Sequence, residues 1–169
     1  MSELVVTPPE GIEANNLLYR WLYKIYLRLE NAIWLSVDRN AVVQSIPNNA
    51  ATTVAFNNVV ADTIGGWDNA AYTYTAQVGG PYTVIAKGRL TGNLAAGKTF
   101  YMAILVNNVS VAQARAGNVA LTDPDITVIK DIKLRKGDVV KIQAFQDTGG
   151  ALDLYGTTTH SYLTIKRIN

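Results

Sequence analysis

An alternation of apolar and polar residues runs through most of the chain after residue 40, and this feature most constrains the fold. Tyr82, Val84 and Ala86 fall on one face of such a run, whereas Thr83 and Lys87 fall on the other. Successive side chains of a strand point to opposite faces, so one face is buried and one is in water. Similar runs recur roughly every 8 to 12 residues between turn formers, which is typical of a β-sandwich or barrel. We expect strands at residues 41–46, 52–57, 72–78, 82–90, 99–106, 109–114, 126–134, 139–146 and 161–168.

One pair of these strands is separated by two asparagines. Asn107 and Asn108 lie between the runs at 99–106 and 109–114. Asparagine tolerates the positive φ that a type I′ turn requires, and this turn matches the twist of a β-hairpin. The sequence therefore predicts a two-residue hairpin at this point.

The residues before the strands follow a helical period. No Gly or Pro occurs between Ile12 and Asn40, so we expect a helix over residues 9–39 that stops near Asn40. The chain then divides into an N-terminal anchor and helix at 1–40 and a β domain at 41–169. Part of the helix follows the a/d spacing of a left-handed coiled coil, at Leu18, Leu22, Ile25, Leu29 and Ala32.

The stretch with coiled-coil spacing is short, and the role of the helix stays open. The helix could set a trimer, dock on other subunits, or pack on the sheet of its own domain. Trp21 and Tyr23 place apolar surface outside the seam, which favours self-association or docking on something larger. Arg20, Lys24 and Glu30 recur through the same stretch, whereas a membrane-spanning helix needs about 20 mostly apolar residues. We expect no membrane insertion.

The composition is weakly charged. Charged residues make up 17% of the chain, the net charge is +2, and there is no cysteine. No global field therefore attracts nucleic acid, and neither disulfides nor thiolate metal sites can form. The basic residues around residues 130–141 alternate with apolar ones, so we interpret them as a solvated hairpin face rather than a nucleic-acid stripe.

Three segments resemble one known superfamily. Residues 56–68 read FNNVVADTIGGWD and are followed by Tyr74, Gly80 and Tyr82, a series similar to the opening strands of the jelly rolls of tumour necrosis factor and the complement first-component globular head. Residues 132–142 resemble the strand-turn-strand of that superfamily. Residues 149–150 and 161–163 resemble its last loop and strand. The likeness covers about residues 50–168.

The resemblance implies an all-β, antiparallel jelly roll of about ten strands in two sheets, assembled as a three-fold trimer with binding loops outward. The sequence contains no collagen-like Gly-X-Y repeat and no cysteine, both common in secreted animal members, and we expect no signal peptide. A predicted helix stands in place of the stalk. This layout resembles phage and viral fibre or head-decoration proteins.

One motif suggests a nucleotide-binding enzyme. Residues 92–99 read GNLAAGKT and match the phosphate-loop pattern through Gly92, Gly97, Lys98 and Thr99. That loop needs a helix after it, whose N-terminus cradles the phosphates. Residues 100–106 instead have a strand pattern, so we interpret the match as chance and keep a phosphate-loop protein as a remote alternative.

The remaining chemistry-bearing residues are few. His160 is the only histidine, and no GxSxG elbow accompanies it, so we predict no catalytic site. Asp123 and Asp125 are loop carboxylates, the type of ligand that calcium prefers, although Asp also forms turns. The resemblance makes a calcium site there a candidate, because some members bind calcium near the trimer apex. Tyr101 and Tyr162 are candidates for the trimer axis or for the core of one subunit.

These observations lead to a main hypothesis and two alternatives. The main one is a virion structural protein, namely a trimeric head or tail fibre or capsid decoration protein made in the host cytoplasm and carried on the virion surface. Its N-terminus would attach to capsid, portal or tail proteins, and its head would bind host-surface glycan or protein by avidity. The alternatives are a cellular cytokine- or lectin-like trimeric binding module and the phosphate-loop protein.

Overall fold

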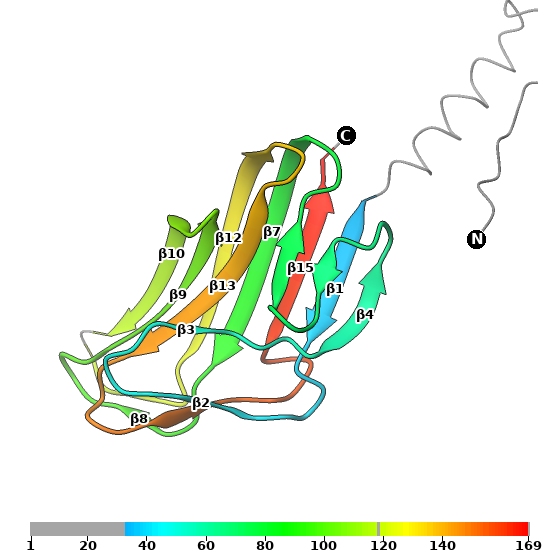
Figure 1. Ribbon diagram of the computed structural model, residues 1–169. Coiled ribbons are helices and arrows are strands. Elements are labelled where there is room, and N and C mark those ends of the chain that lie inside the picture. The colour runs from blue at the N-terminus through cyan, green and yellow to red at the C-terminus, as the bar shows by residue number, and fades with distance from the viewer. Residues whose placement is uncertain (1–32, 118, 169) are drawn as a thin grey trace, which may run out of the picture. The chain divides into compact units, whose positions relative to one another are not determined.

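The structure is a computed structural model that describes residues 33–117 and 119–168. These residues form two antiparallel sheets that face each other, with β12 at one side of the five-stranded sheet and β4 at the other (Figure 1). The order of that sheet is β12-β7-β15-β1-β4. Its strands are β1 (Trp34–Asp38), β4 (Asn58–Asp62), β7 (Gly80–Arg89), β12 (Asp125–Leu134) and β15 (Tyr162–Arg167).

The second sheet has six strands. Its order is β10-β9-β13-β6-β5, and β3 also pairs with β13. Its strands are β3 (Thr52–Thr53), β5 (Trp67–Asp68), β6 (Thr73–Thr75), β9 (Thr99–Val106), β10 (Val109–Gly117) and β13 (Val139–Gln146). Two short pairs lie near one end of the sandwich (Figure 1). They join β2 (Gln44–Ile46) to β14 (Leu152–Leu154) and β8 (Asn93–Leu94) to β11 (Leu121–Thr122).

The core lies between the two sheets and follows the predicted alternation. Tyr82 and Val84 of β7 and Phe100 and Ile104 of β9 have no exposed surface. Burying one such side chain stabilises a fold by about 1.5–3 kcal/mol. Gly88 belongs to this layer, because a Cβ at that position would overlap the side chain of Met102 in the opposite sheet. Glycine therefore sets how closely the two sheets approach each other there.

Several predicted elements are confirmed. Strands β9 and β13 have the predicted bounds, and the described residues are all-β. The hairpin between β9 and β10 is also confirmed, because Asn107 and Asn108 have φ values of 50° and 67° and Val106 pairs with Val109. The short strands β4, β5, β8, β11 and β14 were not predicted.

The predicted helix over residues 9–39 is wrong at its end. Residues 34–38 form β1, which pairs with β15 and β4 inside the five-stranded sheet. Leu35 and Val37 point into the core, so the period there is two rather than helical. The predicted stop at Asn40 marks a turn after a strand, with positive φ at Asn40 and Ala41. The sandwich thus begins before residue 41.

The predicted coiled-coil positions from Leu18 to Ala32 lie outside the described residues, so the N-terminal helix stays a prediction. Within residues 33–117 and 119–168, no helix has the length and apolarity that crossing a membrane requires.

Candidate functional site

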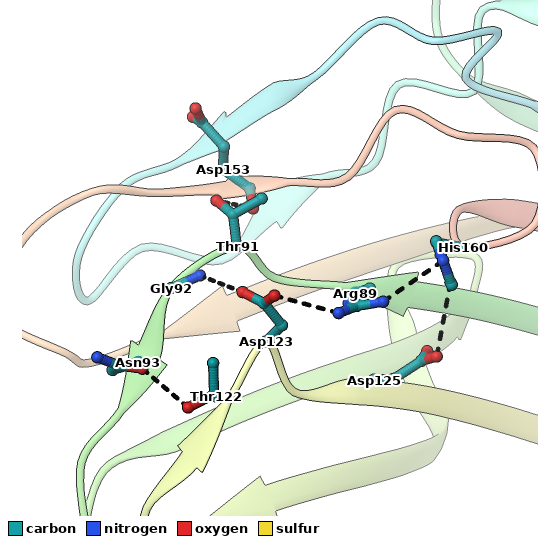
Figure 2. A network of polar contacts seen from close by, with 9 residues as sticks. All are labelled: Arg89, Thr91, Gly92, Asn93, Thr122, Asp123, Asp125, Asp153 and His160. Atoms are coloured by element: carbon teal, nitrogen blue, oxygen red, sulfur yellow. Dashed lines mark hydrogen bonds and ion pairs between the residues drawn. The ribbon is translucent and has the colours of Figure 1, made fainter.

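A network of charged side chains joins three segments at one end of the five-stranded sheet (Figure 2). Arg89 is the last residue of β7, and His160 precedes β15. Asp123 follows β11, and Asp125 is the first residue of β12. Arg89 Nη2 lies 3.1 Å from Asp123 Oδ2, and its Nη1 lies 3.4 Å from His160 Nε2. The guanidinium is therefore held between an acid and an imidazole. Its carbon also lies 5.2 Å from the centre of the Tyr155 ring, which is close enough for a cation–π contact.

Asp123 links the turn between β11 and β12 to the segment that follows β7. It adopts a left-handed conformation with φ of 47°, and its Oδ1 accepts a hydrogen bond of 2.6 Å from the backbone N–H of Gly92. This backbone hydrogen bond lowers the pKa of Asp123. Desolvation partly opposes the shift, and Arg89 adds to it. Asp123 also donates its own N–H to the carbonyl of Gly92, so the two segments hold each other.

Asp125 is paired in the same way. Its Oδ2 lies 3.0 Å from Lys87 Nζ and 3.7 Å from His160 Nδ1. The predicted pair Asp123 and Asp125 thus lies in one cluster, but each carboxylate already holds a basic partner. Among the described residues, no three His, Cys, Asp or Glu side chains are arranged to hold a metal ion. The calcium site stays a prediction, and the geometry assigns these acids to ion pairs that order the loops.

The phosphate-loop match has a different geometry from the motif it resembles. Asn93 and Leu94 form β8, and the N–H of Lys98 donates to the carbonyl of Ala95, which closes a turn. Thr99 then begins strand β9 rather than a helix. The turn therefore lacks the helix N-terminus that would face a phosphate.

The two predicted aromatic positions lie on different sheets. Tyr162 belongs to β15, where the alternating Leu163 and Ile165 are buried, so Tyr162 points to the outer face of the five-stranded sheet. Tyr101 belongs to β9, between the buried Phe100 and Met102, and points to the outer face of the six-stranded sheet. The structure does not bring Tyr101 and Tyr162 together.

An aromatic group that sequence analysis missed surrounds Tyr101. Its ring stacks on Phe145 of the neighbouring strand β13, with centres 4.9 Å apart and planes 14° from parallel. Arg115 of β10 lies 5.5 Å from the centre of the same ring. Register explains the contact, because Tyr101 is opposite both Arg115 and Phe145. Only strand pairing reveals this register, so the sequence alone gives no signal for it.

Both borders of the five-stranded sheet carry some of the exposed aliphatic and aromatic side chains. Ile129 of β12 is 60% exposed, and at the opposite border Trp34 of β1 and Val60 of β4 are 44% and 58% exposed. Both β12 and β4 pair on one side only among the described strands. Each border thus offers apolar surface and free backbone groups, the features that invite another chain to bind.

Solved structures share this architecture. The Eiger TNF of S. frugiperda is 12% identical with a TM-score of 0.61, and the match covers 82% of this chain and 94% of that one. The globular domain of zebrafish complement 1qA protein is 16% identical with a TM-score of 0.52, covering 81% and 98%. Murine APRIL is 10% identical with a TM-score of 0.58, covering 81% and 99%.

These likenesses show the fold. The described residues form a jelly roll of the kind found in TNF-like proteins and in the complement globular head, which confirms the fold that the sequence resemblance implied. No family model matches the sequence, and no curated protein matches it.

Proposed function

On the premise of this shared jelly roll, we propose that the chain is a non-enzymatic binding module that assembles as a homotrimer. One observation carries the assembly: apolar side chains are exposed at both borders of the five-stranded sheet, at Ile129 on β12 and at Trp34 and Val60 on β1 and β4. Two different patches on one subunit suit a head-to-tail contact, which closes into a ring when the rotation between subunits allows it. The resemblance noted in the sequence implies that the ring has three members.

The experiment is sedimentation of the full chain and of two variants, Ile129→Asp and Val60→Asp. Each buries a charge in the proposed contact, and because every contact in a ring uses both patches, either change alone should yield monomers. Val78→Asp is the matched control, since Val78 is 40% exposed in the loop between β6 and β7 and belongs to neither patch. A native chain that sediments as a monomer, or a trimer that survives both changes, would refute the proposal.

The fold supports a binding module of the cytokine or lectin kind, and we propose a finer placement as an alternative form of it. In that placement the trimer is a head or tail fibre or capsid decoration protein on a viral or phage surface, bound to capsid, portal or tail proteins through residues 1–32. The support is the apolar spacing from Leu18 to Ala32 and the fibre-like layout of the sequence. Electron microscopy of particles decorated with an antibody to residues 33–169 would test it, and unlabelled particles would count against it.

A further inference from the structure

The outer face of the six-stranded sheet has a hollow beside the β9–β10 hairpin. Its volume is about 340 Å³, and Thr73, Asn107, Asn108, Val139 and Lys141 line it. Val139 and Lys141 alternate with the buried Val140 and Ile142 of β13, so they point outward into the hollow. A central strand and a tight hairpin supply the walls, so the site is formed before any ligand binds.

Three polar groups of this hollow have no partner among the described residues. The amide of Asn107 is engaged, because it donates to Asp138 Oδ1 at 2.9 Å and accepts from the N–H of Val139 at 2.9 Å. The hydroxyl of Thr73, the amide of Asn108 and the ammonium of Lys141 make no hydrogen bond or ion pair with other described residues. Polar groups that converge on a hollow beside one apolar wall are typical of small-molecule sites.

Among the described residues that line the hollow, Lys141 is the one that carries a charge. The neighbouring acids accept hydrogen bonds from other groups, and neither forms an ion pair with Lys141. Asp138 accepts from the backbone N–H of Arg135 at 2.7 Å as well as from Asn107, and Asp68 accepts from the N–H groups of Ala70 and Ala71. The ammonium therefore remains available for an anionic group of a ligand.

The same face continues toward an aromatic platform. Lys141 and Phe145 point outward from one strand and lie four residues, about 13 Å, apart. Phe145 stacks on Tyr101, beside which Arg115 borders a second hollow of about 190 Å³, together with Thr99, Ala116 and Gly117. An extended ligand could thus meet a cation at each end and aromatic rings between them.

We propose that this face binds an acidic glycan, with the anionic group on Lys141, hydroxyls on Thr73 and Asn108, and a further sugar ring beside Tyr101 and Phe145. This inference rests on the proposed binding function and names its ligand class. Free amides and hydroxyls suit sugar hydroxyls, and the apolar faces of sugar rings pack on aromatic side chains. Two isolated basic residues do not form the stripe that nucleic acid requires. Strands β9 and β13, which carry Lys141 and the stacked rings, are central strands and offer no free edge to an extended peptide.

The test is binding of the full chain to an array of immobilised glycans that are neutral, carboxylated or phosphorylated. We expect binding to acidic members, and the carboxylated and phosphorylated arms separate the two sources of negative charge. Lys141→Gln should weaken binding about tenfold or more, because a charged hydrogen bond is lost. Asn108→Gly should weaken it less. Lys130→Gln is the matched control, since it removes the same charge from the other sheet.

The outcomes separate this inference from the proposed function. A trimer in sedimentation that binds no glycan, or only neutral ones, overturns the glycan site and leaves the binding module intact. Equal binding by Lys141→Gln and the native chain also overturns it. Equally strong binding to an immobilised acidic peptide or to single-stranded DNA would show that the face selects negative charge rather than sugar, and would overturn it as well.

Discussion

The outer faces of the two sheets follow the same alternation but differ in what they expose. Strands β7 and β12 of the five-stranded sheet contain Lys87, Arg89, Asp125, Lys130, Asp131 and Lys133. Strands β9, β10 and β13 contain only Arg115 and Lys141 as charged residues, together with the stacked rings of Tyr101 and Phe145. The core constrains the inward positions of both sheets alike, whereas the outward positions are free to differ. We infer that one sheet serves assembly at its borders and the other presents a weakly charged face to a ligand.

The largest loss of stability should come from a change in the core layer between the two sheets. Gly88→Val would drive a side chain into Met102 and Leu154, and overpacking of this kind costs about 1–3 kcal/mol. Urea unfolding should show a lower midpoint, and assembly and glycan binding should weaken together. Gly150→Val is the control, because a Cβ at Gly150 meets nothing within 4 Å. Loss of only one function would show that the two faces do not depend on a common sheet spacing.

A second pair of substitutions should show that assembly and glycan binding depend on different sheets. Trp34→Ala removes the exposed aromatic side chain from the β1–β4 border of the five-stranded sheet and should weaken the trimer about tenfold without changing the glycan affinity of each subunit, as expected for an interface aromatic. Tyr101→Ala removes the stacked ring from the other sheet and should weaken glycan binding while the trimer persists. Sedimentation and the glycan array measure the two effects. The comparison of the faces fails if both variants lose the same function.

Acid should loosen the end of the five-stranded sheet. The pKa of Asp123 is lowered in the folded chain by the Gly92 N–H and Arg89, so its contribution to stability is complete above its ordinary pKa of 3.8 and is lost as the pH falls through the lower folded value. Urea midpoints at pH 7, 4 and 3 should therefore decline. In Asp123→Asn this acid-dependent loss should be smaller. An identical decline in the variant would show that Asp123 does not cause the loss of stability in acid.

The smallest effect on stability should come from the hairpin. Asn108→Gly preserves the turn, because glycine also adopts the φ of 67° found there, so the urea midpoint should hardly change. The variant nevertheless loses an amide from the hollow, so glycan binding should weaken. Asn108→Val, which disfavours positive φ, should lower the midpoint and provides the contrast. A large stability loss in Asn108→Gly would mean that the amide, rather than the turn, stabilises the hairpin.

Sequence patterns predicted the parts of the fold that local chemistry determines. The bounds of β9 and β13 were predicted correctly because their runs are long and alternate cleanly. The turn between β9 and β10 was predictable because Asn107 and Asn108 tolerate the positive φ that it requires. Strand β1 was assigned to the helix because no Gly or Pro separates it from the helical stretch. Its identity depends on pairing with β15, more than 120 residues further along the chain.

The candidate sites were harder to predict for the same reason. Asp123 and Asp125 are recognisable as loop acids, but their partners Arg89 and His160 are distant in sequence. Arg39 belongs to no sequence motif, although it is 2% exposed and donates to the carbonyls of Val42 and Ala55. Desolvation lowers its pKa. A buried arginine bound by backbone carbonyls leaves no pattern in a single sequence.

The position of β1 between β15 and β4 has a consequence for how the protein is made. The first strand of the jelly roll cannot complete its pairing until the last one, which ends at Arg167, has left the ribosome. The five-stranded sheet must then close only after β15 has emerged, while the β9–β10 hairpin can form earlier. Nascent chains stalled before residue 162 should expose Leu35 and Val37 to chaperones.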